Sequence, residues 1–166
     1  KRGRWPTRPC PTGPSKHAKA RCEEWESDAA RDVFAGSHDG YERLGDPVTH
    51  RRSIEFDKQT RVIRVTDTLS CKASHQVEIF WHFAETCQVQ SVGNEISARC
   101  GNQGAAISMP GGGWTPVILS GQEEPPMGWI SRHFDQKCHS PSVVWSGQIT
   151  GSTTLNTEIR LVRHGS

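Results

Sequence analysis

Long apolar runs are missing from this sequence. Hydrophobic residues make up 33% of the 166 residues, and the mean hydropathy is −0.65. No stretch approaches the roughly 18 consecutive apolar residues that a membrane-spanning helix needs. Apolar residues at helical spacing are missing as well, because glycine or proline interrupts nearly every candidate segment. We therefore expect a soluble chain that has no membrane partner and no long amphipathic helix.

Cysteines are too few for a disulfide scaffold, and none of them belongs to a CxxC pair. The chain has six cysteines in 166 residues, whereas small secreted scaffolds are far denser in them. Zinc ribbons need two ligands close together on a turn, so this spacing argues against one. We expect buried or free thiols, with a single disulfide as the alternative.

Acidic residues are missing from the first 22 positions, which hold seven lysines and arginines. The whole chain has 20 basic and 18 acidic residues, so the remainder carries 13 basic against 18 acidic residues, a net charge of −5. The basic isoelectric point therefore reflects the N-terminal stretch, and a nucleic-acid partner is not indicated. Residues 1–16 are rich in proline, so we expect a disordered segment there, followed by one domain over 17–166.

Segments typical of β-strands fill that domain. The clearest is 75–83, where every second residue is apolar. Segments 48–57 and 61–69 flank the turn 57–60 and predict a hairpin, and 155–161 predicts a half-buried closing strand. Ten to twelve short strands at spacings of about ten residues predict an all-β fold, an antiparallel β-sandwich. The weaker candidate strands are 20–27, 32–38, 87–92, 95–100, 104–109, 115–120, 127–134 and 142–149.

A polar turn between two predicted strands is the first candidate for a binding site. It contains His38 and Tyr41 around the turn signal Asp39-Gly40. Turns beside strand ends are where sheet proteins often display functional side chains. The alternative is structural, with Asp39 capping the turn and Tyr41 packing with its hydroxyl satisfied.

The start of the next predicted strand is the second candidate. It carries His50, Arg51 and Arg52, and strand alternation puts His50 and Arg52 on one face and Arg51 on the other. The planar guanidinium of arginine suits carboxylate ligands. The alternative is that these arginines are solvated or form ordinary ion pairs.

Histidines and cysteines do not stand at metal-binding spacings. His75 and His82 are seven residues apart on one predicted strand, and an odd separation places them on opposite faces. A denser group has suitable ligand types but no regular spacing, so we predict no metal site. That group is His133, Asp135, Cys138 and His139.

Three stretches carry a resemblance to a known family. They are SHDGYERLGDPVTHRRSIEFDKQTRVIRVTDTL, HQVEIFWHFA and GWISRHFDQKCHSPSVVWSGQITGSTTLNTEIRL. In this order they resemble the C-terminal part of heparinase II/III-family polysaccharide lyases, over roughly residues 17–162, and residues 1–16 do not fit the pattern. The resemblance implies a β-sandwich that follows an N-terminal α/α-toroid, and β-elimination of glycans that contain uronic acid.

The resemblance also says where the catalytic groups belong. In the family, the catalytic tyrosine and an asparagine or glutamate come from the toroid, and a histidine and metal ligands come from HxHAD-like and AHN-like segments. Neither string occurs in this sequence. The resemblance therefore implies no catalytic residue, metal ligand or cofactor here, and a C-terminal fragment that is inactive alone. It implies the toroid and an acidic polysaccharide as partners, and a periplasmic or secreted location.

Tryptophans support two alternative functions. Exposed tryptophans stack on sugar rings, so the chain could be a stand-alone carbohydrate-binding module or a purely structural domain. Trp81 and Trp145 lie within apolar strands and are expected in the core. Trp114 and Trp129 lie at loop edges and are the candidates for sugar contact, with core or half-buried packing as the alternative.

Overall fold

The computed structural model describes residues 18–109 and 113–163, and every regular element in this part of the chain is a β-strand. The predicted all-β class is therefore confirmed, whereas the predicted segment 1–16 lies outside the described residues. The described residues form no helix, so this part of the chain has no helix that is long and apolar enough to cross a membrane. The strands are β1 (Ala20–Ser27), β2 (Arg31–His38), β3 (Thr49–Asp57), β4 (Val62–His82), β5 (Gln88–Val92), β6 (Glu95–Cys100), β7 (Gln103–Ser108), β8 (Pro116–Leu119), β9 (Trp129–Ile130), β10 (Cys138–His139) and β11 (Ser142–Arg163).

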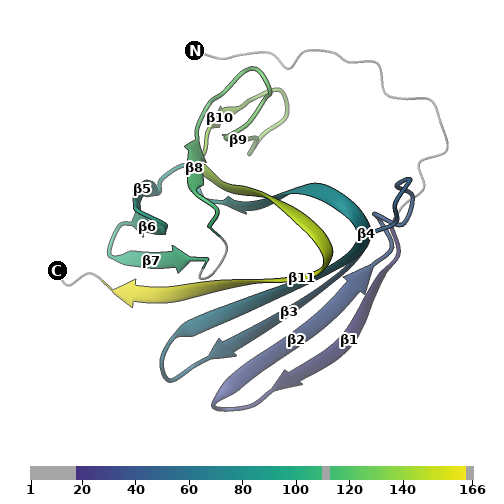
Figure 1. The fold of residues 1–166 in the computed structure, drawn as a ribbon. Helices are drawn as coiled ribbons and strands as arrows, with labels where there is room; N and C mark the ends of the chain where they lie inside the picture. Colours follow the sequence, from purple (N-terminus) through teal and green to yellow (C-terminus); the bar gives the residue numbers. More distant parts are fainter. Residues whose placement is uncertain (1–17, 110–112, 164–166) are drawn as a thin grey trace.

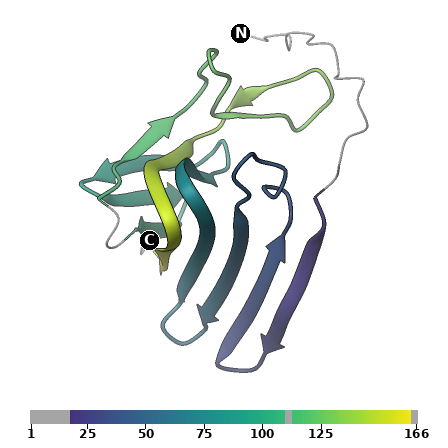
Figure 2. The ribbon, with the colours of Figure 1, turned by 45° about the vertical axis from the view of Figure 1, so that its right-hand side comes forward.

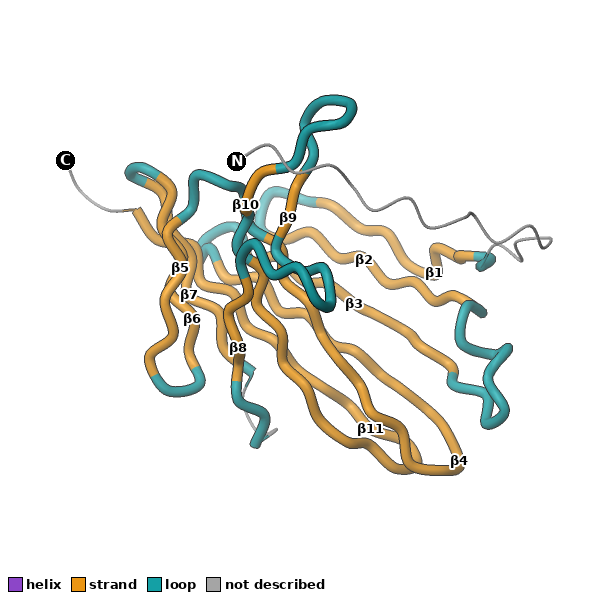
Figure 3. The backbone as a smooth tube through the Cα atoms, turned by 90° about the horizontal axis from the view of Figure 1, so that it is seen from above, coloured by secondary structure: helices purple, strands orange, loops and turns teal. Residues whose placement is uncertain are grey.

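Nine of these strands form one antiparallel sheet. Their order is β1-β2-β3-β4-β11-β7-β6-β5, and β8 pairs with β11 beside this path (Figure 1). The predicted hairpin joins β3 to β4, and the Asp57 carboxylate accepts the N–H groups of Gln59 and Thr60 in its turn. Seen from above, β5, β6 and β7 gather on the side away from β1 and β2 (Figure 3).

Two strands are much longer than the sequence pattern predicts. Predicted segments 61–69 and 75–83 are one strand, β4, and segments 142–149 and 155–161 are one strand, β11. These two strands pair along nearly their whole length and bend together (Figure 2). The bend turns one continuous sheet back over itself, so both layers of the sandwich share β4 and β11.

An irregularity in the pairing accounts for the bend. Ser74 pairs with Thr150 and Ser70 with Ser152, so three residues of β4 face Gly151 alone. Such β-bulges bend the strand and increase its twist. Gly151 has φ +71°, a conformation that glycine adopts without steric cost. The bulge divides each long strand into two alternating halves, which explains why the sequence pattern reads as separate strands.

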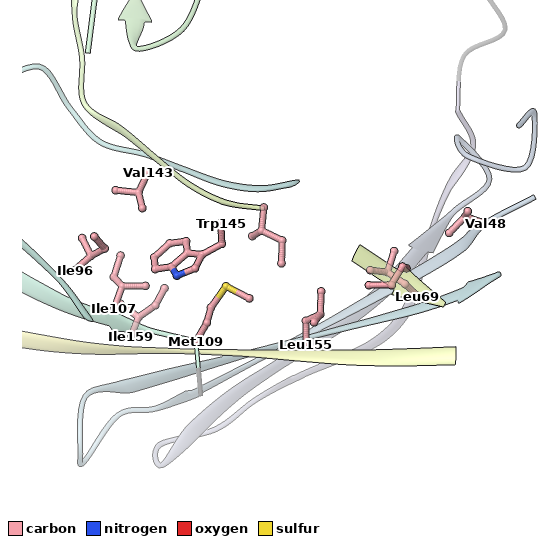
Figure 4. Packing of buried hydrophobic residues seen from close by; sticks show 11 residues of the cluster. Val48, Leu69, Ile96, Ile107, Met109, Val143, Trp145, Leu155 and Ile159 are labelled. Carbon is pink, nitrogen blue, oxygen red and sulfur yellow. The ribbon is translucent and has the colours of Figure 1, made fainter. Parts of the chain in front are cut away.

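The main core lies inside this fold. Trp145, on the first half of β11, is fully buried and points toward Ile107, Met109 and Ile159 (Figure 4). Ile159 is on the second half of β11, so the strand packs against itself across the bend. Trp81 is half-buried against the same core, and the predicted core positions of Trp81 and Trp145 are confirmed.

The segment 127–134 is not the full strand that the sequence predicts. Only Trp129–Ile130 is extended, and it pairs with Cys138–His139 in a separate two-stranded sheet. The chain turns away at residues 131–136, where the Ser131 hydroxyl donates to the His133 carbonyl and Asp135 has φ +56°. This local turn removes the backbone groups that a longer ladder would need.

Candidate functional site

The register of three neighbouring strands gathers polar side chains on the concave face of the sheet. His38 on β2 pairs with His50 on β3, and Arg52 on β3 pairs with Asp67 on β4. Directly paired residues in a sheet project to the same face. The predicted common face of His50 and Arg52 is therefore confirmed, and the structure adds His38 and Asp67 to it.

A chain of hydrogen bonds links these residues. The Gly40 N–H donates to His38 Nδ1 (3.1 Å), so in a neutral imidazole the His38 proton is on Nε2. That group donates to His50 Nδ1 (3.1 Å), and His50 Nε2 in turn donates to Asp67 Oδ1 (2.6 Å). These tautomers follow from the hydrogen-bond network. The chain runs in one direction and ends on a carboxylate.

Asp67 is the anchor of this network. It is only 2% exposed, yet Arg52 Nε and Nη2 donate to its two carboxylate oxygens at 2.7 and 2.9 Å. Burial alone would raise the pKa of Asp67, but hydrogen bonds from His50 and Arg52 and the guanidinium charge lower it below its usual range. Asp67 is therefore a buried anion, and it holds Arg52 and His50 in fixed orientations.

A cavity of about 380 Å³ lies against this network. The bend of β4 closes one side of it, and the turn that contains Tyr41 closes another. Tyr41 is 44% exposed, and its ring meets that of His38 edge to face, with the centroids 5.0 Å apart. The lining residues are His38, Tyr41, Leu44, Val48, His50, Arg52, Asp67, Leu69, His75, Gln76, Val77, Glu78, Ile79 and Phe80.

The cavity offers apolar contact together with hydrogen-bond donors. Arg52 commits Nε and Nη2 to Asp67, while its side chain stays 37% exposed and its guanidinium lies 5.9 Å from the Trp81 ring. An arginine held in this way presents its remaining N–H groups to a ligand without losing rotamer freedom at binding. Such a site suits a ligand that carries a carboxylate or sulfate.

Three of the sequence candidates lie away from this cavity. Arg51 projects from the other face of β3 and donates to Glu23 at 2.7 Å. Trp114 packs against Gly147 so closely that an added Cβ there would lie 1.9 Å from its ring. Trp129 donates to the Gln122 carbonyl and has Lys137 Nζ 3.8 Å from its ring centroid.

One group of potential metal ligands assembles at the bend of β4. Asp46, Cys71 and His75 bring three ligand atoms within 4.8 Å of one another. No other such group is found among the residues that the structure describes. Asp46 Oδ2 already accepts the N–H groups of Lys72 and Ala73 and a hydrogen bond from His75. These contacts satisfy backbone donors that the bulge removes from the ladder, which gives the group a structural role.

The predicted separation of His75 and His82 is confirmed by their partners. His75 contacts Asp46, whereas His82 contacts the Ser142 hydroxyl. Sequence reasoning missed Asp67 as a member of the site. Its signal was present, because Asp67 alternates with Val65 and Leu69, both buried, and a carboxylate at an inward strand position needs a buried partner.

Comparison with known families decides what kind of domain this is. The model of the heparinase II/III-like C-terminal family matches residues 4–160. The chain belongs to this family. The match begins ahead of residue 17, the start of the resemblance in the sequence. A search of curated proteins found no match.

Solved structures of lyases share the fold of this family member. A heparan sulfate lyase, HepC, from Pedobacter heparinus superposes with a TM-score of 0.71 at 14% identity, over 89% of this chain and 22% of that one. A heparinase III described as the BT4657 gene product gives 0.70 at 14% identity, over 88% and 22%. Another heparinase III gives 0.70 at 13% identity, over 88% and 22%. This chain therefore spans about a fifth of the length of these structures.

Proposed function

We propose that this chain is the C-terminal β-sandwich domain of a polysaccharide lyase that cleaves uronic-acid glycans by β-elimination. In this proposal it acts with an N-terminal α/α-toroid, and the cavity beside Arg52 binds the acidic glycan. Membership of the heparinase II/III-like family carries the proposal. The cavity supports it, because Arg52 and Tyr41 combine a fixed guanidinium with a half-exposed aromatic ring.

The chemistry of β-elimination explains what such a cavity would contribute. The uronate carboxylate must be neutralised before a base removes the neighbouring proton, and an acid must protonate the departing oxygen. Arg52 is held by the buried Asp67 carboxylate, and its remaining N–H groups can donate hydrogen bonds to a sugar carboxylate. In this proposal the domain binds and positions the glycan, and the rest of the parent protein supplies the base and the acid.

We predict that truncating Tyr41 weakens glycan binding. Tyr41→Ala should weaken the binding of heparan sulfate oligosaccharides about tenfold, since losing a well-placed aromatic contact removes about 1.4 kcal/mol. Isothermal titration calorimetry measures this, and a neutral dextran of equal length should not bind. Trp25→Ala is the matched control, because Trp25 is an exposed aromatic residue (74%) that is not among the cavity residues. Equal affinities of the wild type and Tyr41→Ala would contradict this use of the cavity.

We predict that the isolated chain does not cleave glycans. Incubation with heparin, heparan sulfate or alginate should produce no unsaturated uronate, measured by its ultraviolet absorbance, whereas a full-length family lyase should produce it from its own substrate. Turnover by the purified chain would contradict this prediction. If Arg52→Gln abolished that turnover and Arg51→Gln retained it, this domain would contain its own acid and base.

A further inference from the structure

Two cysteines face each other at the open end of the hairpin that β5 and β6 form. Gln88 pairs with Arg99 at the outer end of the ladder, and continuing this register by one residue places Cys87 opposite Cys100. Both are half-buried free thiols. The Cys100 thiol lies 3.1 Å from the Thr86 hydroxyl, and burial together with the proximity of the Cys100 thiol raises the pKa of Cys87. The sequence separates them by a whole hairpin, and the antiparallel pairing brings them together.

The hairpin register identifies the kind of pair that they form. Val92 pairs with Glu95 across a two-residue turn, where Gly93 has φ +62°. Residues that flank a two-residue turn form a hydrogen-bonded pair, and hydrogen-bonded and non-hydrogen-bonded pairs then alternate along the ladder. Counting outward makes the Cys87 and Cys100 positions a non-hydrogen-bonded pair, for which the Cα atoms lie about 4.5 Å apart. That separation is within the range that a disulfide spans without backbone movement.

We propose that Cys87 and Cys100 form a disulfide that closes the β5–β6 hairpin when the chain meets a disulfide oxidant such as oxidised glutathione. One thiolate attacks a glutathione sulfur and releases one reduced glutathione, which leaves a mixed disulfide. The second thiolate attacks the protein sulfur of that bond and releases the second reduced glutathione. Two protein thiols are oxidised, one glutathione disulfide is reduced, and the two thiol protons end on the released glutathione.

The position of the hairpin indicates what the bond would do for the structure. β5 is the last strand of the nine-stranded sheet and presents a free edge in the described topology. Closing the outer end of the hairpin would restrain this edge and lower the entropy of the unfolded chain. Burial and the Cys100 thiol raise the pKa of Cys87, so the exchange should accelerate as the pH rises, because the thiolate is the attacking form.

The test is oxidation of the folded full chain with oxidised glutathione, followed by trapping with N-ethylmaleimide in denaturant and mass spectrometry of tryptic peptides. Trypsin cuts after Lys72, Arg99 and Arg132, so the bond should link peptide 73–99 to peptide 100–132. The link should be absent from Cys87→Ser and from Cys100→Ser. Cys138→Ser is the matched control, because Cys138 is an exposed thiol outside the hairpin, and it should keep the link.

A second measurement keeps the test independent of any single variant. Oxidation should raise the melting temperature of the wild type by about 5–10 °C, as expected for closing a short loop, and should leave the double variant Cys87→Ser/Cys100→Ser unchanged. Full labelling of both thiols after oxidation, or a dominant link between other cysteines, would overturn the proposal. Neither result depends on glycan binding, so the proposed function is tested separately.

Discussion

Replacing Asp67 by asparagine is expected to lower the free energy of unfolding by about 3 kcal/mol, because it removes one partner of a buried ion pair. The amide keeps the size of the carboxyl group but places an N–H₂ group against donors, since both Arg52 and His50 donate to Asp67. Urea denaturation followed by tryptophan fluorescence measures the loss. Because Arg52 is partly exposed to solvent, the expected loss of unfolding free energy lies at the lower end of the range for broken buried ion pairs.

Asp135→Asn is the matched control for this prediction. Asp135 is exposed and has φ +56°, a conformation that asparagine tolerates well. Its replacement should change the free energy of unfolding by less than about 0.5 kcal/mol. If Asp67→Asn were as mild as this control, the network would not hold the sheet together, and its effect would be confined to the cavity.

The same carboxylate predicts a dependence of stability on acid. The pKa of Asp67 is lowered in the folded state, so the folded chain holds the ionised form more strongly than the unfolded chain does. The resulting stability is present above the unfolded pKa of about 4 and is lost as the pH falls through the lower folded value. Asp67→Asn should therefore lose less stability than the wild type when the pH is lowered below about 4.

Replacing Trp145 by alanine is expected to lower the free energy of unfolding by about 4 kcal/mol, because it leaves a large cavity between the two layers. Trp145 is fully buried, and its neighbours come from β7 and from both halves of β11, so no single element can close the space (Figure 4). Urea denaturation again measures the change. Trp25→Ala removes the same side chain from an exposed position and should change stability by less than about 0.5 kcal/mol.

Trp145→Phe separates the cavity from the indole N–H. In the described structure, Trp145 Nε1 is buried and has no hydrogen-bond partner, and such a group costs stability when it is desolvated. Phenylalanine removes this donor while it fills part of the space, so the loss should be less than half of that in Trp145→Ala. A loss as large as that of alanine would mean that the ring shape, and not the burial of apolar volume, governs this position.

Strand positions were largely readable from the sequence, since alternation of apolar and polar residues is a local property of an extended chain. Segment 48–57 shows this well, because its alternation correctly separated His50 and Arg52 from Arg51. Segment 127–134 shows the limit. Its composition suits a strand, but only Trp129–Ile130 finds a partner, and strand pairing is not encoded in composition.

The residues of the candidate site could be predicted from the sequence only in part, for the same reason. His38, Tyr41, His50 and Arg52 could be selected from turn signals and residue types, and all four line the cavity. Trp114 and Trp129 were selected in the same way, but they pack against Gly147 and Lys137. Whether a loop-edge tryptophan faces solvent depends on which distant segment covers it.

The sequence by itself determined the all-β class, the positions of most strands and the family resemblance, because each depends on residue types and their local order. Only the tertiary structure decided that four predicted strands are two bent ones and that Asp67 orients Arg52 and His50. It also decided that Cys87 faces Cys100. These features depend on register across strands far apart in the chain, where a shift of one residue would turn every side chain to the other face.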